Sequence, residues 1–234
     1  MEYSFLVRLL DHYGFERTTE KIVPGQPIVV QGIAGCGKTT LLRNFHQEYP
    51  SIPIYSCFPQ KISENSEELQ LLANQDLPQG AILDEYLAHK FDYQKCLAVF
   101  ADPLQYSHLG AFLRPHYQTF RTYRFGPSIA NFITEKIGYS IESLLSEEKT
   151  ILKECDPYTT DPIGQIIASN HEVLNYIKPQ AVDAICSCEV LGKEFQTVSC
   201  YYQSHKLEDS AEERRGLYIA ISRAKSAVLL FDLD

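Results

Sequence analysis

Short apolar runs recur along the first half of the chain, separated by segments whose apolar residues have helical spacing. The runs suit buried strands, while Thr39 to Glu48 and Glu67 to Asn74 favour helices. The predicted strands of this half are 28–30, 52–56, 81–84 and 97–101. This alternation is typical of a parallel sheet whose strands are joined by crossover helices, so we predict an α/β fold.

The same alternation starts again after about residue 120, with helices expected at Ser128 to Lys136 and at Glu212 to Ser222. Residues 138–162 contain two Asp-Pro steps and favour turns over regular structure. The predicted strands of this half are 165–168, 181–185, 195–201 and 227–231. We therefore expect two α/β domains, residues 1–120 and 121–234.

The N-terminal segment from Phe5 to Leu10, with Tyr13 and Phe15, places apolar residues on one helical face. This pattern predicts a helix packed on the first domain. Self-association or binding to a membrane surface is the weaker interpretation, because the segment carries few basic residues.

The segment from Gly32 to Thr39 fills the phosphate-loop template, with two glycines separated by four residues and then Lys and Thr. Glycines let the backbone curl so that N–H groups and the helix N-terminus face the phosphates. Lys38 can reach the β- and γ-phosphates, and the Thr39 hydroxyl suits Mg²⁺. A glycine-rich turn before a helix is the alternative. The residues predicted to bind the nucleotide are Gly32, Ala34, Gly35, Cys36, Gly37, Lys38, Thr39 and Thr40, with Cys36 interpreted as a small filler.

Two further strands end in groups that could serve such a loop. Asp84 and Glu85 end a strand expected beside the phosphate loop, where Asp84 would hold Mg²⁺ and Glu85 would activate water. A turn with a helix cap explains that pair equally well in isolation. Asp102 and Gln105 follow the next strand, and Gln105 could sense the γ-phosphate or position water, unless the segment is a plain Asp-Pro turn.

Arg124 and Arg223 lie in the second predicted domain. Arginines brought to a γ-phosphate stabilise the charge that develops in the transition state. Either arginine considered alone fits a surface cation. We predict that both complete the nucleotide site, with the nucleotide held between the domains.

Composition narrows the class of protein. The chain has 234 residues, 44% of them hydrophobic, and a net charge of −9, which argues against coating nucleic acid through bulk positive potential but leaves room for a local basic groove. We expect neither a transmembrane segment nor a secretory signal. Seven cysteines fit a reducing cytosol, and Cys186 and Cys188 are too close for the usual zinc pair. The acidic clusters 64–68, 147–148 and 208–213 are interpreted as solvated faces.

The order of these motifs resembles that of the superfamily 1 helicases of positive-strand RNA viruses, from about Pro27 to Phe231. The resemblance rests on the phosphate loop, Asp84-Glu85, Asp102-Pro103-Leu104-Gln105, Arg124, Val190 to Phe195 and Ala220 to Lys225. Ala101 departs from the glycine that is commoner there. Within this group, Ile82 to Tyr86 and Phe100 to Gln105 look like the triple gene block protein 1 family of potexviruses, carlaviruses and relatives.

The resemblance implies two RecA-like parallel-sheet domains, an NTP-binding domain in 1–120 and a helicase domain in 121–234. It implies an NTPase and RNA helicase that uses ATP or another NTP with Mg²⁺. It further implies movement of viral RNA through plasmodesmata and suppression of RNA silencing. The partners would be single-stranded viral RNA, viral coat protein, the other triple gene block proteins and further copies of the chain. The location would be the host cell cytoplasm, with plasmodesmata or inclusions possible.

Carried over residue by residue, the resemblance gives the expected site. The catalytic residues would be Lys38, Glu85, Gln105, Arg124 and Arg223, and the metal ligands Thr39 and Asp84. Gly192 and Glu194 would lie in a motif that couples the nucleotide to RNA. Tyr106, Tyr123 and Phe125 could stack on bases, although a core position is the favoured interpretation of each one by itself.

Two other functions remain open at this stage. A scaffold would bind RNA, coat protein or host factors and use the nucleotide as a structural ligand. A small-molecule kinase would transfer phosphate to a metabolite, but Gly192, Arg223 and the Asp102 turn have no place in it.

Overall fold

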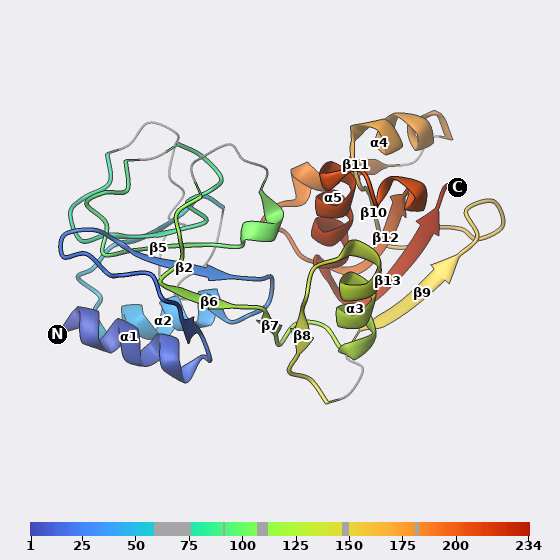
Figure 1. Cartoon of the computed structure of the whole chain (residues 1–234). Helices are drawn as coiled ribbons and strands as arrows, with labels where there is room; N and C mark the ends of the chain where they lie inside the picture. Colours follow the sequence, from blue (N-terminus) through green and yellow to red (C-terminus); the bar gives the residue numbers. More distant parts are fainter. Residues whose placement is uncertain (59–75, 91, 107–111, 147–149, 181–182) are drawn as a thin grey trace. The chain divides into compact units, whose positions relative to one another are not determined.

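The computed structural model describes residues 1–58, 76–90, 92–106, 112–146, 150–180 and 183–234. The chain divides into two compact units, Met1–Phe120 and Arg121–Asp234, each built around its own sheet (Figure 1). The predicted parallel-sheet α/β fold is confirmed in both units. The NTP-binding and helicase roles expected for the two ranges stay predictions.

The sheet of unit 1 has six strands within the described residues, in the order β1-β6-β2-β5-β4-β3. Its neighbours pair in parallel except for β1 with β6. The strands are β1 (Glu16–Arg17), β2 (Ile28–Gly32), β3 (Ile54–Ser56), β4 (Ile82–Asp84), β5 (Ala98–Ala101) and β6 (Tyr117–Thr119). The residues of β4 and β5 are all buried, as their continuous apolar sequences predict.

The strand that ends in Asp84 was expected beside the phosphate-loop strand, and this expectation is wrong. β5 lies between β2 and β4 and pairs with both of them. Strand order depends on which crossover each connection makes, and the sequence of a single strand does not contain that information.

α1 (Glu2–His12) lies beside α2 (Lys38–Glu48) along the sheet of unit 1 (Figure 1). Leu6 and Leu10 are fully buried, and the ring centroids of Phe5 and Phe45 are 6.1 Å apart. The prediction of an N-terminal helix packed on the first domain is therefore confirmed.

The sheet of unit 2 has five strands within the described residues, in the order β11-β10-β12-β13-β9, and these neighbours pair in parallel. The strands are β9 (Ile151–Cys155), β10 (Gln165–Ala168), β11 (Ala184–Cys186), β12 (Phe195–Tyr202) and β13 (Ala224–Asp232), with β7 (Arg121–Thr122) and β8 (Glu142–Ser143) forming a small second sheet. The described helices of this unit are α3 (Pro127–Phe132), α4 (His171–Ile177) and α5 (Ala211–Ile221). Short turns of helix occur at η1 (Pro103–Gln105) in unit 1 and at η2 (Ile133–Ile137), η3 (Lys178–Gln180), η4 (Ser187–Val190) and η5 (Ser204–Lys206) in unit 2.

The prediction that residues 138–162 lack regular structure is wrong, because β8 and β9 lie there. β9 pairs with β13 at one end of the described strand order, and its residues are exposed or half-buried. A strand with little burial needs no apolar run, so backbone pairing forms it without a sequence signal.

The remaining predictions concern two helices, the acidic clusters and a membrane span. The helix expected at 128–136 is present as α3 followed by the π-helical turn η2. The helix expected at 67–74 and the acidic clusters 64–68 and 147–148 lie outside the described residues, and the interpretation of 208–213 as a solvated face is wrong for Glu213, which is fully buried. Among the residues that the structure describes, no helix combines the length and the apolar character that crossing a bilayer requires.

Candidate nucleotide site

The phosphate loop joins the end of β2 to the start of α2, as predicted from its sequence. Gly35 and Gly37 have φ angles of 76° and 99°, in the left-handed region that glycine adopts without strain. Gly37 is the N-cap of α2, and the first amides of that 11-residue helix have no partner within the helix. The loop thus ends in a helix N-terminus of the kind that binds anions.

Gly32 is required by space rather than by its backbone angle. A Cβ atom at Gly32 would lie 2.5 Å from Cys36 Sγ and 2.9 Å from the ring of Phe15. The Cys36 side chain is 2% exposed and fills the inside of the loop, as its interpretation as a small filler requires.

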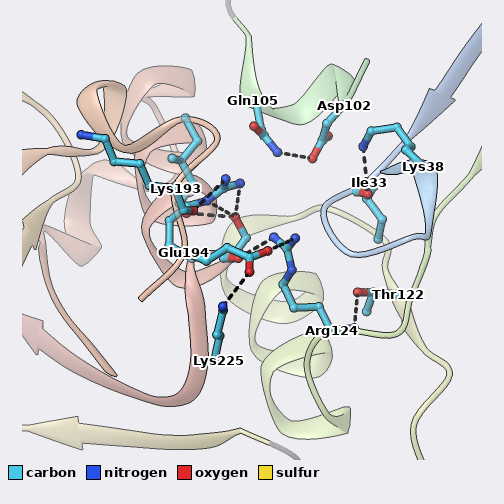
Figure 2. A network of polar contacts seen from close by, with 12 residues as sticks. Ile33, Lys38, Asp102, Gln105, Thr122, Arg124, Lys193, Glu194 and Lys225 are labelled. Carbon is cyan, nitrogen blue, oxygen red and sulfur yellow. Dashed lines mark hydrogen bonds and ion pairs between the residues drawn. The ribbon is translucent and has the colours of Figure 1, made fainter. Parts of the chain in front are cut away.

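Lys38 is the first residue of α2, and its side chain folds back over the loop (Figure 2). Its Nζ donates hydrogen bonds to the carbonyl oxygens of Gly32, at 2.7 Å, and Ile33, at 3.3 Å. Only 8% of the residue is exposed, so the ammonium is held among backbone acceptors. A bound phosphate would offer the same donor a fully charged partner.

Acidic groups keep this buried ammonium charged. Burial by itself would lower the pKa of Lys38, but the acidic groups around it, Cys36, Glu85, Asp102 and Asp84, raise that pKa to about 12. Lys38 therefore carries a full positive charge throughout the neutral range.

The acidic pair lies at the carboxyl end of β4. Asp84 is 1% exposed and Glu85 is 6% exposed, and the Glu85 N–H donates to Asp84 Oδ1 at 3.1 Å. Glu85 has a φ of 59°, in the left-handed region that non-glycine residues rarely adopt. Strain of this kind costs about 1–3 kcal/mol and concentrates at functional sites.

Asp84 shares its buried position with a second carboxylate. Burial, followed by the charge of Glu85, raises the pKa of Asp84 to about 7, while the Lys38 charge and the Glu85 N–H act in the opposite direction. Protons therefore compete for this carboxylate near neutral pH, and a bound cation would take their place.

Replacing Asp84 with asparagine is expected to stabilise the nucleotide-free protein, more strongly at pH 8 than at pH 5. The folded pKa of Asp84 exceeds the unfolded value of 3.8, so the folded state holds more protons between these values and stability falls as pH rises through this window. Asp84→Asn removes that loss. Melting temperatures at both pH values measure the effect, with the exposed Asp76→Asn as control. A difference in melting temperature that does not change with pH contradicts this account.

Tyr106 positions Glu85. Its hydroxyl donates to Glu85 Oε2 at 2.9 Å, and its ring packs beside the core of unit 1. Burial and the Glu85 charge raise the pKa of Tyr106, so the hydroxyl stays a donor. From the sequence, Tyr106 was predicted only to stack on bases or to pack in the core. No motif indicates its hydrogen bond to Glu85, which is distant along the chain.

Asp102 and Gln105 form a compact buried turn after β5. Asp102 Oδ1 accepts the Leu104 N–H at 3.0 Å, and its Oδ2 accepts Gln105 Nε2 at 2.7 Å (Figure 2). The Asp-Pro turn is therefore present, and it fixes the Gln105 amide. Whether Gln105 senses a phosphate stays a prediction.

The three motifs of unit 1 meet at one edge of its sheet. β2, β5 and β4 are parallel neighbours, so their carboxyl ends, at Gly32, Ala101 and Asp84, face the same way. Ligands of α/β sheets bind outside these ends. Thr39, which is half-buried in α2, and Asp84 supply a hydroxyl and a carboxylate, which are oxygen ligands of the kind that Mg²⁺ prefers. Of the other predicted loop residues, Ala34 is buried and Thr40 is exposed.

In unit 2, Arg124 lies within a charged network rather than standing alone on the surface. Its Nη2 pairs with Glu194 Oε1 at 2.5 Å, and its Nη1 donates to the Ser222 carbonyl at 3.0 Å (Figure 2). Lys225 pairs with the same carboxylate at 3.2 Å. Glu194, expected in a coupling motif, is therefore the acceptor that joins two cations.

Arg223 is 4% exposed, which rules out the surface-cation alternative for it. Its Nε donates to the Ile219 carbonyl at 3.2 Å, and its Nη2 to Ser222 Oγ at 3.0 Å. Gly192 adopts a φ of 76° in the turn before β12. The roles of Arg124 and Arg223 toward a nucleotide stay predictions, since the structure describes both only within their own unit.

The candidate stacking residues divide by exposure. Phe125 is fully buried and belongs to the core, which confirms the core interpretation for it and excludes base stacking. Tyr123 is 47% exposed and presents its ring to solvent. Chain position could not separate these two neighbours, because burial is decided by packing.

Comparison with known proteins gives the family of this chain. Residues 28–232 match the family described as the viral superfamily 1 RNA helicase core domain. The movement and silencing protein TGBp1 of Narcissus mosaic virus is 32% identical over 234 residues, which are 100% of this chain and 97% of the relative. The chain belongs to the TGBp1 family of viral superfamily 1 RNA helicases. The TGBp1 of Indian citrus ringspot virus (isolate Kinnow mandarin/India/K1/1996) is also 32% identical, over 97% of this chain and 95% of its own length.

Among solved structures, an arterivirus nonstructural protein 10 (helicase) in complex with DNA resembles this TGBp1 chain with a TM-score of 0.52 and 12% identity. The match covers 99% of this chain and 59% of the arterivirus protein. At this identity the likeness supports the fold alone. The helicase family and the fold expected from the motif order are confirmed.

Proposed function

We propose that this TGBp1 chain is an RNA-stimulated NTPase and RNA helicase that uses ATP or another NTP with Mg²⁺. The observation that carries the proposal is the buried Lys38 in the phosphate loop, surrounded by Asp84, Glu85 and Asp102 at one edge of the sheet. Mg²⁺, held by Thr39 and Asp84, would neutralise charge on the phosphates. Membership of a helicase family favours this proposal over a small-molecule kinase.

Each residue of unit 1 then has a chemical task. Lys38 exchanges its carbonyl partners for the β- and γ-phosphates. Glu85, held by its strained backbone and by the Tyr106 hydroxyl, orients the attacking water and accepts its proton. Gln105 is proposed to contact the γ-phosphate, and Arg124 and Arg223 to stabilise the transition-state charge.

The biological role follows from the names of the relatives. The closely matching proteins are called movement and silencing proteins, so we propose that this chain supports cell-to-cell movement of viral RNA through plasmodesmata and suppresses host RNA silencing. Viral coat protein, the other triple gene block proteins and further copies of the chain are proposed partners. The host cytoplasm is the proposed location, and seven cysteines without a regular framework fit a reducing compartment.

The test is NTP hydrolysis by the purified chain with and without single-stranded RNA, together with separation of an RNA duplex. Stimulation by RNA and strand separation support the helicase. Hydrolysis and RNA binding without strand separation would favour the scaffold, in which the NTPase does not drive processive unwinding.

Replacing Tyr123 with alanine is expected to weaken binding of single-stranded RNA by about fivefold to a hundredfold, because stacking of one base on an aromatic ring is worth about 1–3 kcal/mol. Fluorescence anisotropy with a labelled RNA measures the affinity. Tyr158→Ala, which removes a 78% exposed tyrosine from the same unit, serves as the matched control. Equal affinities for the two variants would remove Tyr123 from the RNA path.

A further inference from the structure

Three metal-ligating side chains that have no part in the proposed NTP or RNA site gather in unit 2. His171, Cys186 and Cys188 place one ligand atom each within 4.8 Å of one another. His171 begins α4 just after β10, Cys186 ends β11, and Cys188 lies in η4. Because β10 and β11 are parallel neighbours, their carboxyl ends bring these residues together.

The loops that carry the three residues are held at a fixed separation. Ser187 Oγ, between the two cysteines, donates to the Ser169 carbonyl at 2.6 Å. Asn170, next to His171, caps α4 by accepting the Val173 N–H at 2.8 Å, and its side-chain amide donates to the buried Glu213. These bonds fix the ligand positions without any contribution from the ligands themselves, as a preorganised site requires.

The distance between two of the ligand atoms suits a tetrahedral ion. Cys188 Sγ and His171 Nε2 are 3.6 Å apart. Zinc bonds of about 2.3 Å to sulfur and about 2.0–2.1 Å to nitrogen, opened to the tetrahedral angle, put sulfur and nitrogen about 3.6 Å apart. An S–H···N hydrogen bond explains that one distance, but it does not explain why the Cys186 ligand atom also lies within 4.8 Å of the other two.

The Cys186 side chain is held in position by the capping box at the start of η4. The side chain accepts the backbone N–H of Glu189, while the Glu189 carboxylate accepts the Cys186 N–H at 3.2 Å. Hydrogen bonds to a ligating sulfur orient it and stabilise its charge. Cys186 is 2% exposed, whereas His171 and Cys188 are exposed, so the ligand set is anchored on one side and open on the other.

We propose that His171, Cys186 and Cys188 form a Zn²⁺ site with three protein ligands and a fourth position open to solvent. The short spacing between Cys186 and Cys188 by itself argues against the usual zinc pair. The third ligand, His171, follows a different strand, so the spacing of the two cysteines cannot reveal it. The ion joins the loops that follow β10 and β11 and thereby stabilises unit 2.

The experiment measures zinc stoichiometry and affinity by competition with a chromophoric chelator, using the purified reduced full-length chain. One equivalent of Zn²⁺ is expected in the wild type. Cys188→Ser and His171→Ala each change an exposed residue, so both variants are expected to fold, and each should bind zinc at least tenfold more weakly. Cys155→Ser, which changes a partly exposed cysteine of β9, is the matched control and should keep wild-type affinity.

Substitution with Co²⁺ adds a spectroscopic test. The wild type and Cys155→Ser should show sulfur-to-cobalt charge transfer and tetrahedral visible bands, which Cys188→Ser and His171→Ala should lose or shift. Zinc should raise the melting temperature of the wild type and leave that of Cys188→Ser unchanged. Equal zinc affinity in the wild type and Cys188→Ser overturns the proposal. So does a wild type that binds no zinc when fully reduced.

Discussion

Replacement of Lys38 by alanine is expected to lower kcat for NTP hydrolysis by about a hundredfold or more. Loss of a single preorganised donor to a developing negative charge costs about 10²–10³ in rate. The Lys38 ammonium is buried and fully charged before any ligand binds, so this donor needs little reorganisation when it meets a phosphate. Phosphate release by the purified variant, with and without single-stranded RNA, measures the loss.

The controls for this variant separate chemistry from folding. Lys21→Ala removes an exposed lysine of the same unit and should keep wild-type turnover. Lys38→Arg keeps the charge but changes the donor geometry, so it should fold and still hydrolyse NTP far more slowly than the wild type. Undiminished turnover in Lys38→Ala would remove the phosphate loop from the catalytic site.

Replacement of Gly216 by alanine is expected to destabilise unit 2 by about 3 kcal/mol or more. Glycine to alanine inside a helix normally stabilises a protein by about 0.5–1 kcal/mol, so the sign of this effect is itself informative. A Cβ atom at Gly216 would overlap the Ser169 carbonyl oxygen, lie 2.6 Å from the Ser169 carbonyl carbon and lie 3.0 Å from Ser187 Oγ. Backbone must move to admit it, and overpacking of this kind costs about 1–3 kcal/mol or more.

Chemical denaturation followed by circular dichroism measures this change. Arg215→Ala, one residue earlier on α5 and half-buried, is the control and should change stability by about 0.5 kcal/mol or less. An unchanged or raised stability in Gly216→Ala would mean that α5 does not pack closely against Ser169 and Ser187.

Much of this protein follows from contiguous sequence. The phosphate loop, the strand before it and α2 after it occupy neighbouring residues, so their spacing alone predicts their geometry. The apolar runs of β2, β4 and β5 predict buried parallel strands for the same reason. The order of the motifs along the chain is enough to indicate the helicase family.

The tertiary structure decided what joins residues far apart in sequence. It placed β5 between β2 and β4, gave Glu85 the Tyr106 hydroxyl, and buried Phe125 while leaving Tyr123 exposed. The tertiary structure also pairs β9 with β13, although no apolar run in the sequence predicts a strand there.

The cluster of His171, Cys186 and Cys188 shows most clearly what the sequence alone does not predict. The sequence by itself determined the phosphate loop, the two parallel sheets and the family, because each of these is indicated by residues that are close together along the chain. Only the tertiary structure decided which strand ends are neighbours, because strand order is set by crossover connections and packing rather than by the residues of one strand. The side chains that meet at those ends, and the chemistry that they share, therefore become visible only in the fold.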